Sequence, residues 1–251
     1  MRMEIITFGG GSRLELCRAY LSSLSPRRSI VILPIPTTKD GVHIKGTDTP
    51  LTDIYPLLKE GVTVAAYGLP LQVKREIESL AATVFDGEED EEFLSENARL
   101  TAEGALGIIL TDSDRSLSEL KIGIIGYGRI GSRLMRYLLL LGARVRLYTR
   151  NKMLRQTLGS EGIETSDFSE AVDFSGIDIL VNTAPVRVME KEQLLEYERG
   201  GLRIYDLASG ICFPDSPSVK KLSSIPETVY PRSGGRLYAE FILRKLSEVE
   251  E

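Results

Sequence analysis

Short segments dominated by apolar residues recur along the chain and alternate with helical patterns. Such segments lie at 29–33, 62–66 and 121–125. Between them, apolar residues return at helical spacing, as at Leu14 and Leu21, which is typical of helices that pack on a sheet. Apolar strands without alternation indicate burial on both faces, and hence parallel sheets covered by helices. The pattern predicts an α/β fold.

The alternation also predicts the domain organisation. We expect a smaller, flavodoxin-like α/β domain at 1–97 and a Rossmann domain with a doubly wound parallel sheet at 98–231. The amphipathic segment 232–251 is expected to form a helix that packs back on the N-terminal domain. The acidic run at 86–92 is expected to be a solvated surface connection. A short helix is expected to begin at 169–172.

A glycine-rich turn follows the apolar segment 121–125 directly. Its residues are Gly126, Tyr127, Gly128, Arg129, Ile130 and Gly131, which match the G-x-G-x-x-G pattern of dinucleotide-binding folds. The first glycine permits a tight turn, the second lets backbone approach a pyrophosphate, and the third lets the helix pack on the strand. A helical repeat of leucines and a second strand at 144–148 follow. This context favours a cofactor-binding turn over a chance cluster of glycines.

The end of that second strand bears on which nicotinamide cofactor is used. An NAD site has an acidic residue about 20 positions after the glycines, where it binds the ribose 2′-hydroxyl. This chain has Thr149, Arg150 and Asn151 there instead. Because arginine pairs bidentately with phosphate, we favour NADP over NAD. The alternative is that Arg150 is a solvated residue at a strand end.

A second strand-end turn is expected near the nicotinamide. It contains Asn182, Thr183, Ala184 and Pro185, which provide an amide, a hydroxyl and a stiff turn. Ligands of open parallel sheets bind beyond the carboxyl ends of the strands, at the point where the winding reverses. We therefore interpret these residues as cofactor-binding. A polar strand-end turn without a ligand is the alternative.

Several loops at expected strand ends carry side chains suited to a carboxylated substrate. The cationic candidates are Arg13, Lys39, Lys45, Arg187 and Arg232, and Ser209 adds a hydroxyl in the loop after the strand at 202–207. Each cation could clamp a carboxylate. The alternative for any one of them is a solvated surface residue.

His43 is the only histidine of the chain, and so the only side chain that titrates near neutrality without a large shift. A general base in the first domain is a reasonable role for it. Nothing in the neighbouring sequence identifies a second group that would orient its ring. An exposed residue beside a hairpin turn is therefore the alternative.

Composition narrows the function classes. A net charge of −5 over 251 residues gives no indication of a nucleic-acid partner. Two widely separated cysteines and one histidine exclude the usual zinc constellations, so we expect no metal. No apolar run reaches transmembrane length, and the N-terminus lacks the pattern of a signal peptide. We expect a cytoplasmic protein that does not bind membranes, and a homo-oligomer.

Several short stretches spread along the chain form a distinctive set. They lie at 9–13, 32–36, 39–42, 101–105, 126–131, 182–185, 206–209 and 230–235. In this set the chain resembles the family of dipicolinate synthase A, the A-type component of an enzyme from bacterial spore formers. The Thr-Ala-Glu-Gly-Ala stretch at 101–105 is more distinctive than the glycine turn.

The resemblance implies an activity in sporulation. A dihydrodipicolinate-type ring would be oxidised to dipicolinate by hydride transfer to NADP. The substrate would be a small dicarboxylate. The partner would be the flavoprotein-like B-type component of dipicolinate synthase in the mother-cell cytoplasm.

Departures from the family pattern keep two other functions open. The chain passes from 25–28 directly into the strand at 29–33, where the family has a further strand, and Gly-Ile-Cys at 210–212 replaces a Pro-Gly-Gly. These differences favour a non-catalytic nucleotide-binding regulatory protein as one alternative. A D-2-hydroxyacid dehydrogenase is the other, although that chemistry uses a histidine late in the chain and none follows His43.

Overall fold

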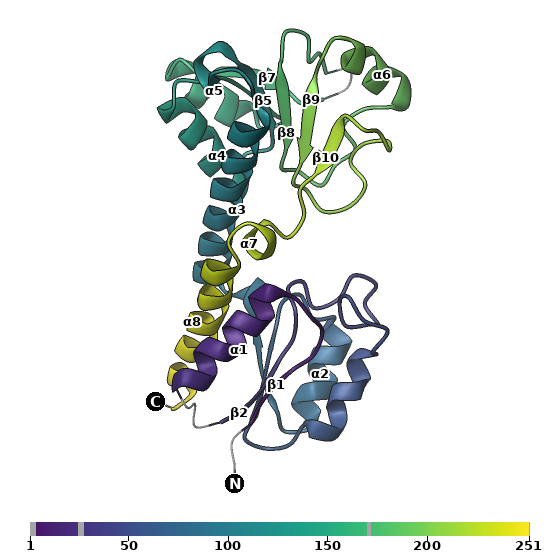
Figure 1. Cartoon of the computed structure of the whole chain (residues 1–251), viewed down its shortest axis with the longest axis vertical. Helices are drawn as coiled ribbons and strands as arrows, with labels where there is room; N and C mark the ends of the chain where they lie inside the picture. The colour runs from purple at the N-terminus through teal and green to yellow at the C-terminus, as the bar shows by residue number, and fades with distance from the viewer. Residues whose placement is uncertain (1–3, 25–27, 170–171, 251) are drawn as a thin grey trace. The chain divides into compact units, whose positions relative to one another are not determined.

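The computed structural model describes residues 4–24, 28–169 and 172–250. The chain forms two compact units (Figure 1). Unit 1 comprises Met1–Leu100 together with Pro226–Glu251, and unit 2 comprises Thr101–Ile225. From the sequence we expected the two boundaries at 97/98 and 231/232. Both units contain parallel sheets and helices, so the predicted α/β class is confirmed.

Unit 1 contains a four-stranded parallel sheet. Its strands, in spatial order, are β1 (Ile5–Thr7), β2 (Ser29–Ile32), β3 (Val62–Ala66) and β4 (Thr83–Asp86). A flavodoxin-like sheet has the order 2-1-3-4-5. The observed order equals that arrangement without its outermost strand, among the residues that the structure describes. The first strand is therefore a sheet edge, and only a short connection joins α1 to β2.

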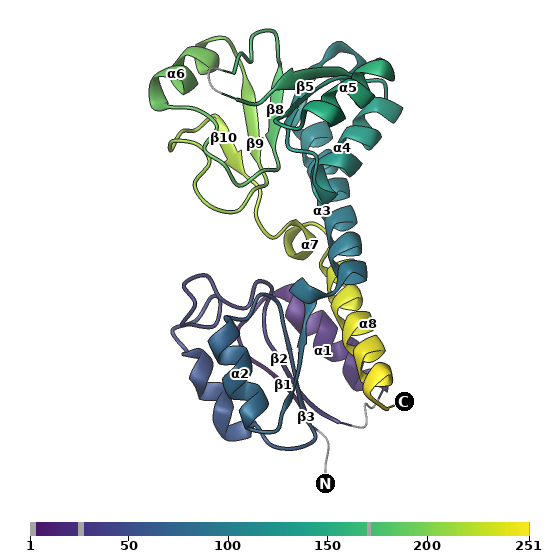
Figure 2. The same cartoon turned by 180° about the vertical axis from the view of Figure 1, so that it is seen from behind.

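Two layers of helices cover the sheet of unit 1. The covering elements are α1 (Ser12–Leu24) and α8 (Pro231–Glu250) on one face, and the 3₁₀ helix η1 (Leu51–Leu57) and α2 (Leu71–Ser79) on the other (Figures 1 and 2). Ile30 and Ile32 of β2 pack toward α1 and α8, whereas Val31 and Leu33 pack toward η1 and α2. Strand β2 is thus buried on both faces, as its unbroken apolar sequence predicts.

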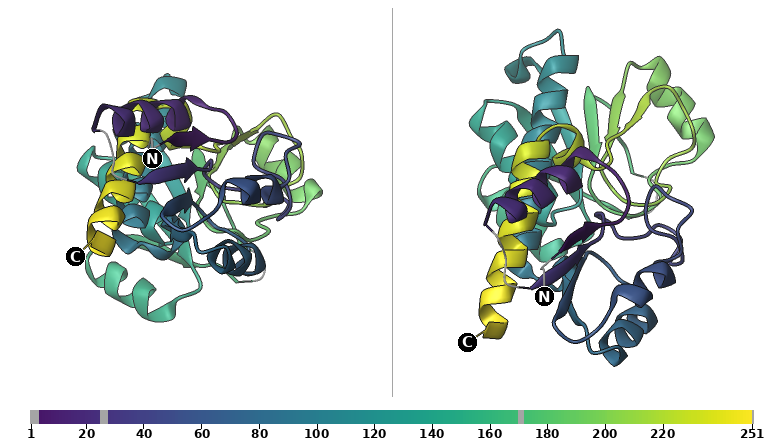
Figure 3. Two further views of the ribbon diagram at one scale, coloured as in Figure 1. Left: turned by 90° about the horizontal axis from the view of Figure 1, so that it is seen from below. Right: turned by 60° about the horizontal axis from the view of Figure 1, so that its bottom comes forward.

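Helices α1 and α8 lie side by side (Figure 3). Gly235 makes this possible, because a Cβ there would lie 2.8 Å from Leu16 Cβ and 2.9 Å from the Arg13 carbonyl oxygen. At Gly234 a Cβ would lie 2.5 Å from the Pro226 carbonyl oxygen. These two adjacent glycines fix how the start of α8 meets the start of α1.

The acidic run at 86–92 is not simply a solvated connection. Asp86 and Asp90 are buried, and a carboxylate oxygen of Asp86 accepts a hydrogen bond from the N–H of Gly68 at 2.8 Å. Asp90 pairs with Arg244 of α8 at 2.7 Å. The prediction is wrong for these two acids because each has a partner from a distant segment, which permits burial.

Helix α3 (Glu91–Asp112) contains the boundary between the units at Leu100/Thr101. The helix begins at Glu91 because Asp90 accepts a hydrogen bond from the Phe93 N–H at 2.9 Å, as an N-cap does. The acidic residues Glu91 and Glu92 in the first turn further suit a helix N-terminus.

Unit 2 contains a six-stranded parallel sheet. Its strands, in spatial order, are β10 (Val219–Lys221), β9 (Arg203–Asp206), β8 (Ile179–Asn182), β5 (Lys121–Ile125), β6 (Arg144–Thr149) and β7 (Glu164–Asp167). Numbered from β5, this is the 3-2-1-4-5-6 order of the doubly wound dinucleotide-binding fold. The winding reverses between β5 and β8. The two turns predicted to bind the cofactor, at 126–131 and 182–185, lie at the carboxyl ends of these two strands.

The remaining helices connect these strands or join the units. Those of unit 2 are α4 (Arg129–Leu140), α5 (Lys152–Ser160), α6 (Lys191–Arg199) and the 3₁₀ helix η3 (Leu117–Glu119), while α7 (Ile225–Thr228) crosses the boundary and the 3₁₀ turn η2 (Gly87–Glu89) belongs to unit 1. The helix expected at 169–172 includes two residues outside the described part of the chain. The sequence did not reveal β7, β10 or α6.

Candidate functional site

The glycine turn after β5 has the geometry that its sequence pattern demands. Gly126 has a φ of +91°, and a Cβ there would lie 2.9 Å from Thr183 Oγ1. At Gly131 a Cβ would lie 2.3 Å from the Gly126 carbonyl oxygen, so a larger residue would push α4 off the strand. A Cβ at Gly128 would meet nothing within 4 Å. The first and third glycines are therefore needed by the fold, whereas the second leaves open space beside the backbone.

The open space at Gly128 lies at the N-terminus of α4. Gly128 is the N-cap residue and supplies no side-chain hydrogen bond to the first turn. The first turn of a helix presents N–H groups without intrahelical partners, and the helix dipole favours negative charge there. Open backbone at a helix N-terminus fits the pyrophosphate of a dinucleotide. Tyr127 and Arg129 flank this space and are exposed.

The residues directly after β6 offer a cationic side chain and no acid. Arg150 is exposed. The Asn151 side chain accepts a hydrogen bond from the Leu154 N–H at 3.1 Å and so caps α5. The neighbouring acid Asp167 pairs bidentately with Arg155, with both distances at 3.0 Å. Its charge is therefore balanced by Arg155.

The turn after β8 is part of a buried hydrogen-bond network. Asn182 is fully buried; its Nδ2 donates to Asp206 Oδ1 at 2.8 Å, and its Oδ1 accepts from the Ala184 N–H at 3.1 Å. The other carboxylate oxygen of Asp206 lies 2.7 Å from Lys221 Nζ. The Thr183 hydroxyl donates to the Ile125 carbonyl at 2.9 Å. In this structure these side chains hold the ends of the central strands together.

The network contains two residues whose part in it was not predicted. Asp206 stood out in the sequence only as part of a motif, and Lys221 lies on β10, a strand that the sequence did not reveal. Lys221 also donates to the carbonyl groups of Ala208 and Gly210, the second at 3.0 Å. It therefore shapes the loop after β9, in which Ser209 is exposed.

That loop borders a cavity of about 320 Å³ at the carboxyl ends of β9 and β10. Cys212, Phe213 and Ser216 line it together with Asp206 and Lys221. Burial raises the pKa of the Cys212 thiol, so the sulfur stays protonated at neutral pH. The cavity is thus bordered by a neutral thiol and by a carboxylate whose charge Lys221 balances.

Arg13 has an unusual place in unit 1. The residue is only 6% exposed, and its Nε donates to the Gly234 carbonyl at 3.2 Å. The guanidinium lies 5.7 Å from the Phe93 ring centroid and 6.0 Å from that of Tyr238. Burial lowers the pKa of Arg13 to about 10, so the group remains charged at neutral pH. A solvated surface residue, the alternative considered from sequence, is excluded.

Lys45 lies close to Arg13 and is half-buried. Its Nζ donates to the Ile35 carbonyl at 2.7 Å and lies 3.5 Å from Glu227 Oε2. Burial lowers the pKa of Lys45; Glu227 opposes that shift, and the positive charges of Lys39 and Arg13 add to it. Arg13 and Lys45 therefore lie near Glu227 at the carboxyl ends of β1 and β2, whereas Lys39, in the loop after β2, is exposed.

The other two candidate cations do not join this group. Arg232 is exposed in the first turn of α8. Arg187 belongs to unit 2, where it is exposed and pairs with Glu190 at 2.5 Å. Neither has the burial that sets Arg13 apart.

His43 has an orienting partner that the sequence did not reveal. Its Nδ1 lies 2.7 Å from Asp40 Oδ2, while Asp40 Oδ1 accepts from the N–H groups of Val42 and His43 at 2.9 and 2.8 Å. Hydrogen bonds from His43 hold the pKa of Asp40 well below its usual range. A carboxylate at Nδ1 favours the tautomer that leaves Nε2 as a proton acceptor. The expectation that nothing orients His43 is therefore wrong.

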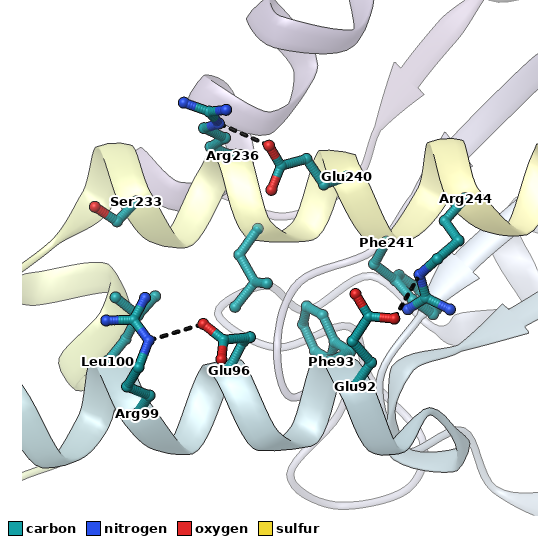
Figure 4. A pocket seen from close by; sticks show the side chains of 11 residues that line it. Glu92, Phe93, Glu96, Arg99, Leu100, Ser233, Arg236, Glu240, Phe241 and Arg244 are labelled. Atoms are coloured by element: carbon teal, nitrogen blue, oxygen red, sulfur yellow. Dashed lines mark hydrogen bonds and ion pairs between the residues drawn. The ribbon is translucent and has the colours of Figure 1, made fainter.

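A groove of about 490 Å³ between α3 and α8 in unit 1 has balanced charge (Figure 4). Its ion pairs are Arg99 with Glu96 at 2.8 Å, Arg236 with Glu240 at 2.7 Å, and Arg244 with Glu92 at 3.2 Å. The apolar side is formed by Phe93 and Phe241, whose ring centroids are 5.0 Å apart. With these three arginines paired, the groove has no excess charge to attract an ion.

Two further properties concern the described residues only. No helix among them is both long enough and apolar enough to cross a membrane. Within the same residues, no three His, Cys, Asp or Glu side chains are grouped as metal ligands would be.

The strand order, the glycine turn and the open backbone at Gly128 define unit 2 as a dinucleotide-binding domain of the Rossmann class. Residues 98–199 match the family described as D-isomer specific 2-hydroxyacid dehydrogenase, NAD binding domain. The prediction of a nicotinamide cofactor is confirmed at this level, without a choice between NAD and NADP.

Comparison with individual proteins is more specific. Over 164 residues the chain is 26% identical to the A-type component of dipicolinate synthase from Bacillus subtilis, in an alignment that covers 61% of this chain and 54% of the relative. The match thus spans about half the length of that curated relative. The predicted resemblance to dipicolinate synthase A is confirmed.

Solved structures agree on the fold. Dipicolinate synthase A of Bacillus halodurans superposes with a TM-score of 0.77 at 19% identity, covering 98% of each chain. The Bacillus subtilis structure gives a TM-score of 0.76 at 18% identity, covering 100% of this chain and 97% of the other. The fold of both units is therefore shared with these structures.

Proposed function

We propose that this chain is an NADP-dependent oxidoreductase of the dipicolinate synthase A type. Its reaction would oxidise a dihydrodipicolinate-type ring to dipicolinate by hydride transfer. The observation that carries the proposal is the dinucleotide turn of unit 2, open at Gly128, in a chain similar to dipicolinate synthase A. The positive charges of Arg13 and Lys45 in unit 1 support a carboxylated substrate.

NADP rather than NAD is proposed from the strand end after β6. The exposed Arg150 follows Thr149 there, and the only nearby acid, Asp167, is engaged by Arg155 among the described residues. A guanidinium binds a 2′-phosphate through charge-assisted hydrogen bonds, whereas the ribose 2′-hydroxyl of NAD calls for an acceptor.

The chain's own residues would bind the substrate and remove a proton. Aromatisation of a dihydropyridine ring releases a hydride and a proton, and a bound NADP supplies the hydride acceptor. Arg13, Lys39 and Lys45 would bind the ring carboxylates through their positive charge. His43 would accept the proton at Nε2 while Asp40 holds Nδ1.

A flavoprotein-like partner, the B-type component of dipicolinate synthase, is proposed from the similarity to dipicolinate synthase A. A cytoplasmic location in sporulating cells and a homo-oligomeric state are proposed on the same ground. The matched NAD-binding domain family makes a D-2-hydroxyacid dehydrogenase the second candidate. The absence of any histidine after His43 in the sequence weighs against that chemistry.

A coupled assay tests the proposal. The dihydrodipicolinate precursor is generated in situ, and the full chain is added with NADP or NAD, with and without a B-type component. Reduced nicotinamide and pyridine dicarboxylate are followed together, and 2-hydroxyacids are assayed as the competing substrates. We expect both products in equal amounts with NADP. Tight NADPH binding without turnover of any substrate would instead indicate a non-catalytic nucleotide-binding protein.

A further inference from the structure

The buried guanidinium of Arg13 has an unmet hydrogen-bonding need. Its Nη2 is inaccessible to solvent and has no hydrogen-bond partner within the part of the chain that the structure describes. Buried charged groups are normally paired and bonded, because an uncompensated buried charge is strongly unfavourable. Contacts with Gly234, Phe93 and Tyr238 hold this side chain in place. Arg13 is thus a fixed, buried cation with an unsatisfied hydrogen-bond donor at Nη2.

The space beside this guanidinium is almost closed. A cavity of about 10 Å³ lies between Gly10, Arg13, Pro34, Glu227 and Tyr238. A volume of this size holds one water molecule at most. A ligand carboxylate does not fit unless a lining group moves.

Glu227 is the lining group with the chemistry of a ligand. Its Oε2 lies 3.5 Å from Lys45 Nζ, and its Oε1 occupies the space into which a Cβ at Gly11 would project, at 1.8 Å. The Ser12 hydroxyl donates to the Glu227 carbonyl oxygen at 3.3 Å. The carboxylate of Glu227 therefore lies over the turn after β1, where glycine alone leaves room for it.

We propose that Glu227 is an internal stand-in for a ligand carboxylate, and that a small dicarboxylate displaces it to reach Arg13 and Lys45. Arg13 and Lys45 face Glu227, so their two positive charges match a dianion once Glu227 has moved away. The identity of the dicarboxylate rests on the proposed function. The displacement concerns unit 1 alone and needs no nucleotide.

Binding of pyridine-2,6-dicarboxylate to the full chain, measured by calorimetry without nucleotide, tests this. Glu227→Gln removes the competing charge at nearly constant shape, so we expect at least a tenfold gain in affinity. Glu248→Gln is the matched control, since Glu248 also pairs with a lysine, Lys245, at 2.7 Å. It should leave the affinity unchanged. Unchanged or weaker binding by Glu227→Gln would overturn the proposal.

Two further sets of binding measurements identify the chemical class of the ligand. Lys45→Met should weaken binding more than tenfold, and it keeps the test valid if Arg13→Met fails to fold. Pyridine-2-carboxylate and inorganic phosphate are run beside the dicarboxylate. Equal gains for phosphate in Glu227→Gln would show a general anion site and refute the dicarboxylate assignment. Tighter dicarboxylate binding by Glu227→Gln without ring oxidation would support this site and refute the proposed reaction. Ring oxidation without tighter dicarboxylate binding by Glu227→Gln would support the proposed reaction and refute the displacement of Glu227.

Discussion

The Nδ1 atom of His43 lies 2.7 Å from Oδ2 of Asp40 in the loop after β2. The loop itself fixes Asp40, because its other oxygen accepts two backbone N–H groups and the Thr38 hydroxyl. An oriented imidazole is a better proton acceptor than a free one, since less reorganisation is needed in the transition state.

Replacing Asp40 by Asn should therefore impair proton removal. The amide oxygen can keep the backbone hydrogen bonds, but it lacks the charge that supports a protonated ring. We expect kcat for ring oxidation to fall roughly 10- to 100-fold with little change in KM, and His43→Gln to lose roughly 10²–10⁴-fold. The pH profile of kcat is the decisive readout, because a purely structural role would leave its shape unchanged.

Asp48→Asn is the control for that experiment. Asp48 is an exposed acid in the same segment of unit 1. If both variants lowered kcat equally, the effect would be one of loop charge, and the role of Asp40 would be rejected.

Arg150→Asp should reverse the cofactor preference. The substitution removes one charge-assisted contact to the 2′-phosphate, which is worth about 1.5–3 kcal/mol. NADPH binding should weaken by roughly 10- to 150-fold, while NADH binding is retained or improved because an acid can accept from the 2′-hydroxyl. Fluorescence titration with both reduced cofactors measures this. Lys152→Asp serves as the neighbouring control, and equal losses for NADPH and NADH in Arg150→Asp would refute the NADP assignment.

The sequence was most informative where the structure depends on neighbours along the chain. The glycine turn is one example, because the spacing of Gly126, Gly128 and Gly131 is a local property. The buried strands such as β5 are another, because burial on both faces leaves a continuous apolar run. The edge strands β7 and β10 have no such apolar run, because each has polar or exposed residues, and the sequence therefore did not reveal them.

The candidate site was only partly predictable because its pairings join distant segments. Lys45 lies close to Glu227, and Arg13 donates a hydrogen bond to Gly234, although the two residues of each pair are far apart in the sequence. No pattern of residue spacing in the sequence predicts contacts of this kind. The pairing of Asp40 with His43 is local, but it depends on loop conformation rather than on a repeat, so the sequence showed the two residues without their geometry.

Asp90→Asn should destabilise unit 1 in a pH-dependent way. The hydrogen bond from Arg244 is the main cause that lowers the pKa of Asp90 to about 2. A carboxyl group with a lowered pKa in the folded state stabilises the protein above its unfolded value near 3.9, and that contribution is lost as the pH falls toward 2. We expect a loss on the order of 1–2 kcal/mol at pH 7, because Arg244 is partly exposed and the pair is screened.

Urea unfolding at pH 7 and near pH 2.5 measures this difference. The gap between Asp90→Asn and the unmodified chain should narrow at the lower pH. Glu92→Gln is the control, since Glu92 contacts the same arginine but its side chain is 71% exposed. A gap that stays constant with pH would mean that Asp90 acts by shape rather than by charge.

Gly128 and Gly131 of the glycine turn should respond to alanine in different ways, because the space around them differs. At Gly131 a Cβ would lie 2.3 Å from a carbonyl oxygen, so Gly131→Ala should cost about 1–3 kcal/mol of folding free energy and weaken cofactor binding as well. At Gly128 nothing lies within 4 Å, so Gly128→Ala should fold normally. It should nevertheless bind NADPH at least tenfold more weakly, because the methyl group would occupy the place of the pyrophosphate. Gly159→Ala in α5 is the control, with open space around it and no role at the turn. Thermal unfolding and NADPH titration of the three variants separate the two effects, and full NADPH affinity in Gly128→Ala would place the pyrophosphate elsewhere.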